Sequence, residues 1–111
     1  MSVFDCGIYV IKCLPTGRHY VGQSLRVGRR LRGHVKRLEA RTHANAYLQS
    51  AWNKYGQENF KFSKVLVCAP DNLTLYERIV ADSLYDCGLF NVNGFADSSN
   101  RSQMSYLVKS R

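Results

Sequence analysis

The segment from Gly7 to Gly22 reads GIYVIKCLPTGRHYVG and predicts a β-hairpin. Its first half, GIYVIKC, is rich in the β-branched and aromatic residues that favour strands. The residues Leu14-Pro15-Thr16-Gly17 supply a turn, and the chain then returns as a second strand. Two tyrosine-bearing tripeptides, Gly7-Ile8-Tyr9 and Tyr20-Val21-Gly22, therefore lie one on each strand of the hairpin.

Two helices are predicted to follow the hairpin. Apolar residues recur at spacings of four, four and three within residues 25–40, which is the pattern of one helical stripe. A shorter helix is expected over residues 45–55, ended by Gly56. The first stripe consists of Val27, Leu31, Val35 and Leu38.

A third strand and a third helix complete the pattern. Residues 60–67, FKFSKVLV, alternate as a strand does. Pro70 ends that strand, and Asp71 or Asn72 can cap a helix that runs to about residue 86. The strand residues expected to face the core are Phe60, Phe62, Val65 and Val67, and His19 in the hairpin is expected to be exposed.

The predicted order is β-β-α-α-β-α. Three strands with helices on the sheet faces make a small layered α/β domain with a three-stranded antiparallel sheet. We expect this domain to cover residues 1–94 and a polar C-terminal tail to cover residues 95–111.

The charge balance points to a polyanionic partner. The chain has 111 residues and a formal net charge of +8, with 45% hydrophobic and 22% charged residues. Nucleic acid is the commonest polyanion that such a protein binds, although excess charge can also serve solubility. The short apolar runs predict no membrane span, and the N-terminus lacks the pattern of a secretory signal. We therefore expect an intracellular protein of the cytoplasm or nucleoid.

The four cysteines, at positions 6, 13, 68 and 87, form no closely spaced pair. Structural zinc sites use tightly spaced ligand pairs, so the spacing disfavours such a site. We expect reduced thiols that are mostly buried.

Positive charge is concentrated between residues 26 and 41. A helical projection places Arg30 and His34 one turn apart at the edge of the apolar stripe, where they border the sheet. The remaining cations can contact phosphates, although a solvated helix face would carry the same pattern. These candidate nucleic-acid contacts are Arg26, Arg29, Arg32, Lys36 and Arg37.

One carboxylate is misplaced for an ordinary amphipathic helix. In the third helix Glu77 falls inside the apolar stripe of Leu73, Tyr76, Val80, Leu84 and Cys87. An ionised carboxylate on such a surface needs a cation to offset its desolvation. That cation can be Arg30 or a neighbour in a structural ion pair. It can also be a hard divalent ion, Mg²⁺ or Mn²⁺, that Glu77 shares with water and a phosphate oxygen.

From Gly7 to about Gly94 the chain resembles the GIY-YIG nuclease domain. The first tripeptide of the family motif is intact, and the second reads Tyr20-Val21-Gly22 in place of YIG. The segment from Leu48 to Gly56 is similar to that of the homing-endonuclease branch of the family. The other positions that match family motifs are Arg30, His34, His43, Glu77 and Asn91.

The resemblance implies a role for each of these positions. Glu77 corresponds to the metal-binding glutamate and Arg30 to the catalytic arginine, which would offset charge on the phosphoryl oxygens. Tyr9, helped by Tyr20 or His34, would orient or deprotonate the attacking water. A tyrosine with a pKa of about 10 is a poor base at neutral pH, so adjacent cations would have to lower its pKa. Supporting roles fall to His43, which can contact the phosphate or pack its loop, and to Asn91, which we expect to brace the site.

The implied activity is metal-dependent hydrolysis of DNA phosphodiester bonds by a single-metal mechanism, with Mg²⁺ or Mn²⁺ as cofactor. The alternatives are a DNA-binding module without catalysis and a repair or recombination nuclease that acts on branched DNA with partners. A protein partner is one source of specificity, and a phage or mobile element is one source of such a gene. The sequence leaves the oligomeric state open.

Overall fold

Three antiparallel strands form a single sheet in the order β2-β1-β3. The structure is a computed structural model, and it describes residues 5–91. The predicted hairpin is confirmed, because β1 pairs with β2 in a register that sets Tyr9 opposite Gly22. β1 also pairs with β3 along its length. The strands are β1 (Gly7–Cys13), β2 (His19–Ser24) and β3 (Phe60–Val67).

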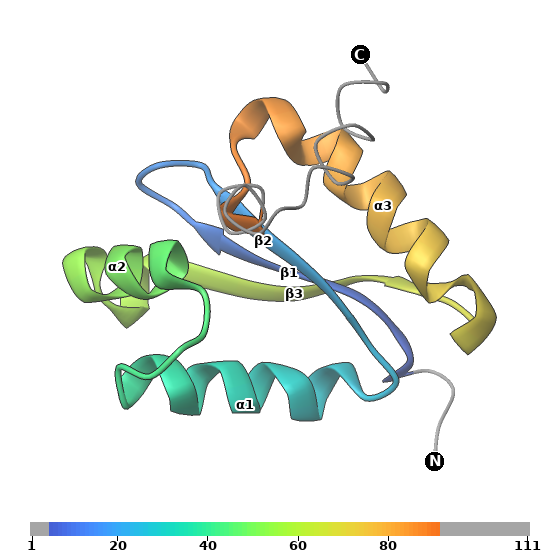
Figure 1. Cartoon of the computed structure of the whole chain (residues 1–111), viewed down its shortest axis with the longest axis horizontal. Coiled ribbons are helices and arrows are strands. Elements are labelled where there is room, and N and C mark those ends of the chain that lie inside the picture. The colour runs from blue at the N-terminus through green and yellow to red at the C-terminus, as the bar shows by residue number, and fades with distance from the viewer. Residues whose placement is uncertain (1–4, 92–111) are drawn as a thin grey trace.

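Helices cover both faces of this sheet (Figure 1). α1 (Val27–Glu39) and α2 (Ala46–Tyr55) lie on one face, and α3 (Leu73–Leu84) lies on the other. The predicted order and the layered α/β class are therefore confirmed. Short 3-10 turns flank β3 and α3, namely η2 (Gln57–Asn59), η3 (Pro70–Asn72) and η4 (Tyr85–Cys87).

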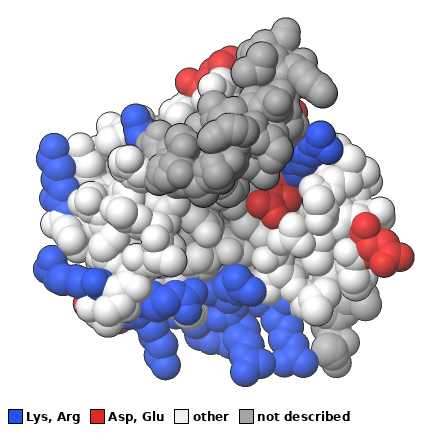
Figure 2. All heavy atoms as spheres, in the orientation of Figure 1, with Lys and Arg blue, Asp and Glu red and all other residues white. Residues whose placement is uncertain are grey.

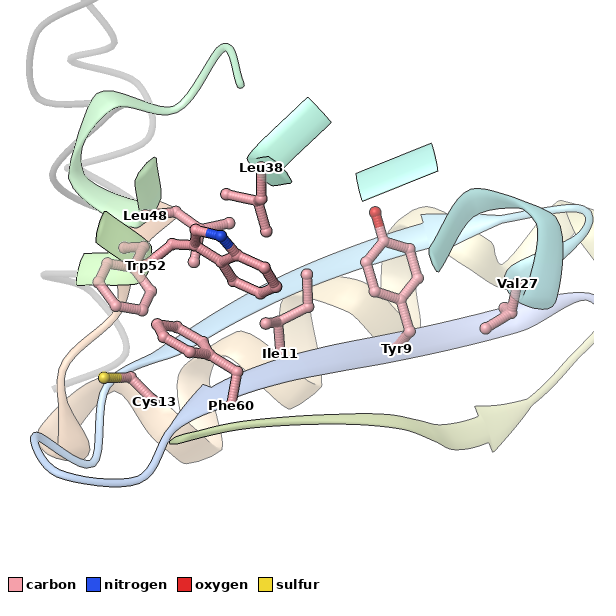
Figure 3. Packing of buried hydrophobic residues seen from close by; sticks show 9 residues of the cluster. Tyr9, Ile11, Cys13, Val27, Leu38, Leu48, Trp52 and Phe60 are labelled. Carbon is pink, nitrogen blue, oxygen red and sulfur yellow. The ribbon is translucent and has the colours of Figure 1, made fainter. Parts of the chain in front are cut away.

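Strand alternation divides the core into two clusters. Tyr9 and Ile11 point to the α1/α2 face, where they pack with Leu38, Leu48 and Trp52 (Figure 3). On the α3 face, the buried cluster consists of Cys6, Ile8, Val10, Val21, Leu73 and Leu89. Consecutive residues of β1 thus belong to different clusters. In the buried cluster on the α1/α2 face, Tyr9 is the residue that carries a hydroxyl group.

The expected burial of Val65 and Val67 is wrong. These side chains are 48% and 50% exposed. The pairing of β1 with β3 shifts between Ile8 and Tyr9, which is the register change of a β-bulge. A bulge inserts an extra residue and breaks the simple alternation that the sequence pattern assumes. β3 is also an edge strand, so part of its surface faces solvent.

Three smaller expectations also fail. Neither Asp71 nor Asn72 caps α3 with its side chain, because the 3-10 turn at Pro70 leads directly into the helix. Cys87 is exposed because α3 ends before it. His19 is buried, at 8% exposure, since its strand is covered by residues 88–89: its N–H donates to the Gly88 carbonyl and it forms a bridge with Leu89. The predicted tail, residues 95–111, lies outside the described residues.

Candidate active site

The two motif glycines allow close approaches that any side chain would block. A Cβ on Gly7 would collide with the backbone carbonyl of Leu66 in β3. A Cβ on Gly22 would collide with Cζ and the hydroxyl oxygen of Tyr9. The Tyr9 ring therefore lies directly over Gly22. Position 22 must be a glycine because any side chain there would occupy the space of the Tyr9 ring.

Tyr9 and His34 form the centre of the site. The Tyr9 side chain is 1% exposed, and its hydroxyl points from the sheet toward α1 (Figure 3). The hydroxyl oxygen lies 2.7 Å from Nε2 of His34, which is 3% exposed on α1. The apolar stripe of α1 thus carries a buried imidazole whose ring nitrogen meets a buried phenol.

His43 extends this contact into a chain of hydrogen bonds. Nδ1 of His34 lies 2.7 Å from Nε2 of His43, and the two rings stack with centroids 4.9 Å apart. The backbone N–H of Asn45 donates to Nδ1 of His43 over 3.0 Å. His43 therefore contacts another histidine of the site, a role that its spacing in the sequence did not indicate.

Tyr20 closes the other side of the histidine pair. Its ring meets His34 edge-on with centroids 5.2 Å apart, and it meets His43 with centroids 6.0 Å apart. Burial and the negative charge of Glu77 raise the pKa of Tyr20, against the positive charges of Arg30 and Arg37. Tyr20 is thus a neutral phenol at neutral pH and packs the histidines in place.

Burial is the main cause of the pKa shifts of the two histidines. Burial, followed by the neighbouring His43, Arg37 and Arg30, lowers the pKa of His34 to about 3. Burial and Arg37 lower the pKa of His43 as well. Both imidazoles are therefore neutral at neutral pH.

Tyr9 does not follow the sequence-based expectation that nearby cations lower its pKa. Burial and Tyr20 raise the pKa of Tyr9, with Glu77 adding to the rise. The charge of Arg30 and a hydrogen bond from it act in the opposite direction and do not prevail. Tyr9 therefore carries its proton in the protein without substrate.

Glu77 is held by an amide rather than by an arginine. Nε2 of Gln23 donates to Oε1 of Glu77 over 2.7 Å. Burial raises the pKa of Glu77, and the bond from Gln23 opposes that rise. Within residues 5–91 the carboxylate has no ion-pair partner, so the ion pair with Arg30 or a neighbour, one of the two alternatives that the sequence left open, is not formed. The negative charge of Glu77 nevertheless acts on Tyr9 and Tyr20.

Arg30 belongs to a basic groove along α1. The groove has a volume of about 680 Å³, and its described lining residues include no carboxylate. Figure 2 shows Lys and Arg side chains gathered on this side of the molecule. Arg32 and Lys36 do not line the groove, whereas the other predicted phosphate contacts do. The lining residues are Ser24, Leu25, Arg26, Arg29, Arg30, Gly33 and Arg37.

Asn91 braces the outer edge of β2. Its Oδ1 accepts from the Val21 N–H and its Nδ2 donates to the Val21 carbonyl, both over 2.8 Å. The side chain thus occupies the hydrogen-bonding groups that a neighbouring strand would use. The preceding Phe90 carbonyl accepts from Nδ2 of Asn45 over 3.3 Å, which ties this edge to the start of α2.

Sequence reasoning missed Gln23 and Asn45. Gln23 directly follows the second tripeptide, so its position was visible but its partner, 54 residues away, was not. Asn45 sits at the start of α2, where its Oδ1 accepts from the N–H groups of Tyr47 and Leu48. That capping role is readable from the sequence. The contact of its backbone with His43 is not.

Two further properties bear on the site. Within the described residues, no three His, Cys, Asp or Glu side chains are grouped as a metal centre made of protein ligands alone would require. No helix in residues 5–91 is both long and apolar enough to cross a membrane.

Comparison with known proteins identifies the family. Two solved structures of one enzyme are similar to this chain, each with 28% sequence identity over 72% of this chain. The catalytic domain of intron endonuclease I-TevI, a glutamate-to-alanine mutant, is covered over 84% of its length with a TM-score of 0.66. The catalytic domain of homing endonuclease I-TevI is covered over 88% with a TM-score of 0.64.

No curated protein matches the sequence significantly. A family model described as the GIY-YIG catalytic domain, however, matches residues 5–81, which is more than half of the chain. The matched range contains both tripeptides, Arg30, His34, His43 and Glu77. The chain therefore belongs to the GIY-YIG family of nuclease domains.

Proposed function

We propose that this chain is a divalent-metal-dependent endonuclease that hydrolyses DNA phosphodiester bonds. The observation that carries the proposal is the position of Glu77. Its half-buried carboxylate lacks an ion-pair partner within residues 5–91, and its charge acts on the same two tyrosines as the charge of Arg30. Such a carboxylate retains a desolvation cost that a bound cation would remove.

The residues present fit a hard divalent cation. Gln23 holds Oε1 of Glu77. The carboxylate is of the ligand type that Mg²⁺ and Mn²⁺ take together with water and substrate phosphate oxygens. When bound, the ion would act as a Lewis acid on the phosphate and on the leaving 3′ oxygen. Glu77 would hold it, and Gln23 would keep the carboxylate in one orientation.

The other side chains would bind and orient the substrate. The groove arginines would hold backbone phosphates, and Arg30 would offset charge that develops on the phosphoryl oxygens. Tyr9 would orient the attacking water and, once ionised, take its proton. Because burial raises the Tyr9 pKa, activity should increase with pH through the alkaline range.

A plasmid-nicking assay tests the proposal. Supercoiled plasmid is incubated with Mg²⁺ or Mn²⁺ and with wild-type protein, Arg30→Ala or Glu77→Ala. Arg32→Ala is the matched control, because it removes an exposed arginine of the same helix that does not line the groove. We expect loss of nicking by about 100-fold or more in the first two variants, since each removes a charge that would act in the transition state.

Two outcomes would contradict the proposal. Equal cleavage by wild type and both site variants would assign the activity to a contaminating nuclease. Salt-sensitive binding of duplex without cleavage in any divalent metal would indicate a DNA-binding module.

The groove supports weak sequence preference. Arginines that contact phosphates position a protein on DNA without reading bases. We therefore expect specificity to come from a partner protein or from further sequence, and cleavage of a random library to show no long recognition site. Linear, nicked, flap and cruciform substrates cut in parallel would reveal a preference for branched DNA.

A further inference from the structure

One hydrogen bond in the site has a direction that cannot be reversed. The backbone N–H of Asn45 can only donate, and it points at Nδ1 of His43 over 3.0 Å. Nδ1 of His43 must therefore offer a lone pair. A neutral imidazole carries one proton, and with Nδ1 bare that proton sits on Nε2.

The direction propagates through the second histidine to Tyr9. Nε2–H of His43 donates to Nδ1 of His34, 2.7 Å away. Since Nδ1 of His34 is thereby an acceptor, the proton of His34 sits on Nε2. That nitrogen lies 2.7 Å from the Tyr9 oxygen and donates to it. The order of donation is Asn45, His43, His34, Tyr9.

The segment that anchors this direction is held on several sides. The His43 N–H donates to Oε1 of Gln49 over 3.0 Å, and Nε2 of Gln49 donates to the Leu38 carbonyl over 3.0 Å. Asn45 begins α2 as its side-chain cap and also donates to the Phe90 carbonyl. The Asn45 amide is thus fixed relative to α1, α2 and residue 90.

We propose that His43 is a positioning residue that makes His34 a hydrogen-bond donor to Tyr9, so that the Tyr9 proton leaves toward substrate and solvent and not through the histidines. The catalytic meaning of this inference rests on the proposed nuclease function. The hydrogen-bond direction itself rests only on the geometry around Asn45.

The arrangement excludes His34 as the base that deprotonates Tyr9. To accept that proton at Nε2, a neutral His34 would have to carry its own proton on Nδ1, facing His43. His43 would then need a bare Nε2 and a protonated Nδ1, which would face the N–H of Asn45. Two donors cannot share one hydrogen bond, so the backbone N–H of Asn45 blocks the reversed arrangement.

The proton balance follows from this direction. Ionisation breaks the O–H bond of Tyr9, and the proton passes to solvent. The phenolate then accepts hydrogen bonds from His34 and Arg30. It takes a proton from the attacking water as the new O–P bond forms, and the leaving 3′ oxygen takes one from solvent. The charged or titratable groups that face the relay are Arg30 and Arg37 from α1, Tyr20 from β2 and Glu77 from α3.

The direct test reads the two tautomers without any activity assay. Two-bond ¹H–¹⁵N NMR spectra of the ¹⁵N-labelled full chain at neutral pH distinguish protonated from bare ring nitrogens. His34→Gln and His43→Gln assign the signals, and His19 serves as a reference ring outside the relay. We expect Nε2–H with bare Nδ1 for both His34 and His43. A protonated Nδ1 on either ring would overturn the proposal.

A pair of variants at position 43 tests the consequence for catalysis. The side-chain amide of His43→Gln can place an N–H where Nε2 lies, so it can still donate to Nδ1 of His34. His43→Ala removes the donor. We expect kcat to fall by about ten- to a hundredfold in His43→Ala with little change in KM, and the glutamine variant to stay within about tenfold of wild type. We also expect the rise of the pH–rate profile to shift to higher pH in His43→Ala.

An equal loss of kcat in both variants would overturn the positioning role, provided that thermal unfolding shows both variants to be folded. No cleavage by wild-type protein together with the expected tautomers would refute the proposed nuclease function and leave the hydrogen-bond direction standing.

Discussion

The two faces of the sheet are packed in different ways. On the α3 face, Ile8, Val10 and Val21 pack against apolar helix residues. On the α1/α2 face, Tyr9 stands beside Ile11 and meets a buried histidine, which meets a second histidine and then a backbone amide. The buried cluster on the first face needs only volume and hydrophobicity. The second needs each polar atom to find a partner, because a buried polar group without one is costly.

The difference shows where the chemistry can lie. Rigid hydrogen-bonded groups on the α1/α2 face can hold a phenol in one orientation. Glu77 comes from the other layer, and its partner Gln23 lies at the end of edge strand β2. The candidate site is therefore assembled at the β2 edge from both layers of the fold.

The largest expected effect separates activity from stability at Glu77. Glu77→Gln keeps an oxygen that can accept from Gln23 but removes the charge that would hold the metal ion. We expect nicking activity to fall by about a thousandfold. The melting temperature should stay equal or increase, because the amide has a smaller desolvation cost than the carboxylate. A lowered melting temperature measured by circular dichroism would show that the carboxylate stabilises the fold.

The adjacent residues Tyr9 and Ile8 compare the two faces directly. Tyr9→Phe keeps the ring and removes the hydroxyl, so activity should fall by about a hundredfold. Ile8→Ala opens a cavity on the α3 face, where Ile8 is fully buried, and should cost about 2–5 kcal/mol of unfolding free energy. Urea unfolding and nicking rates per folded molecule measure both. If Ile8→Ala lost as much activity per folded molecule as Tyr9→Phe, the two faces would not be functionally distinct.

Two glycines provide the next comparison. Gly22→Ala places a Cβ against the Tyr9 hydroxyl and should cost about 1–3 kcal/mol. Gly33→Ala on α1 meets its nearest neighbour, Nη1 of Arg37, at an ordinary 3.6 Å and should stabilise the helix by up to about 1 kcal/mol. Denaturant midpoints give both values. Equal effects would mean that Tyr9 can move away from Gly22.

A further difference between the two layers is a loss of stability in acid. The pKa of His34 is lowered to about 3 in the folded chain, so between about pH 6.5 and pH 3 the unfolded state binds more protons. The free energy of unfolding should therefore decrease as pH falls through this window. Glu77 acts in the opposite direction because its pKa is raised in the folded state. Urea unfolding at several pH values should show a flatter dependence for His34→Gln than for wild type.

Local patterns predicted the elements and their order closely. The hairpin, the helix ended by Gly56 and the strand over 60–67 all appear, because turn residues and periodicity act within a few residues of the chain. The errors in burial at Val65 and His19 lie where distant segments meet. Val65 is displaced by a bulge against β1, and His19 is covered by residues 88–89.

The site divides in the same way. From its motifs and charge alone, the chain can be assigned to its family, and Tyr9, Arg30, His34 and Glu77 can be chosen, because these signals are residue types at short spacings. The partner of Glu77 and the direction of donation from Asn45 to Tyr9 could not be found in that way. They depend on single atoms, contributed by residues up to 54 positions apart, reaching hydrogen-bond distance. Hydrogen bonds act over about 3 Å, and only the packing of helices against the sheet brings those atoms that close.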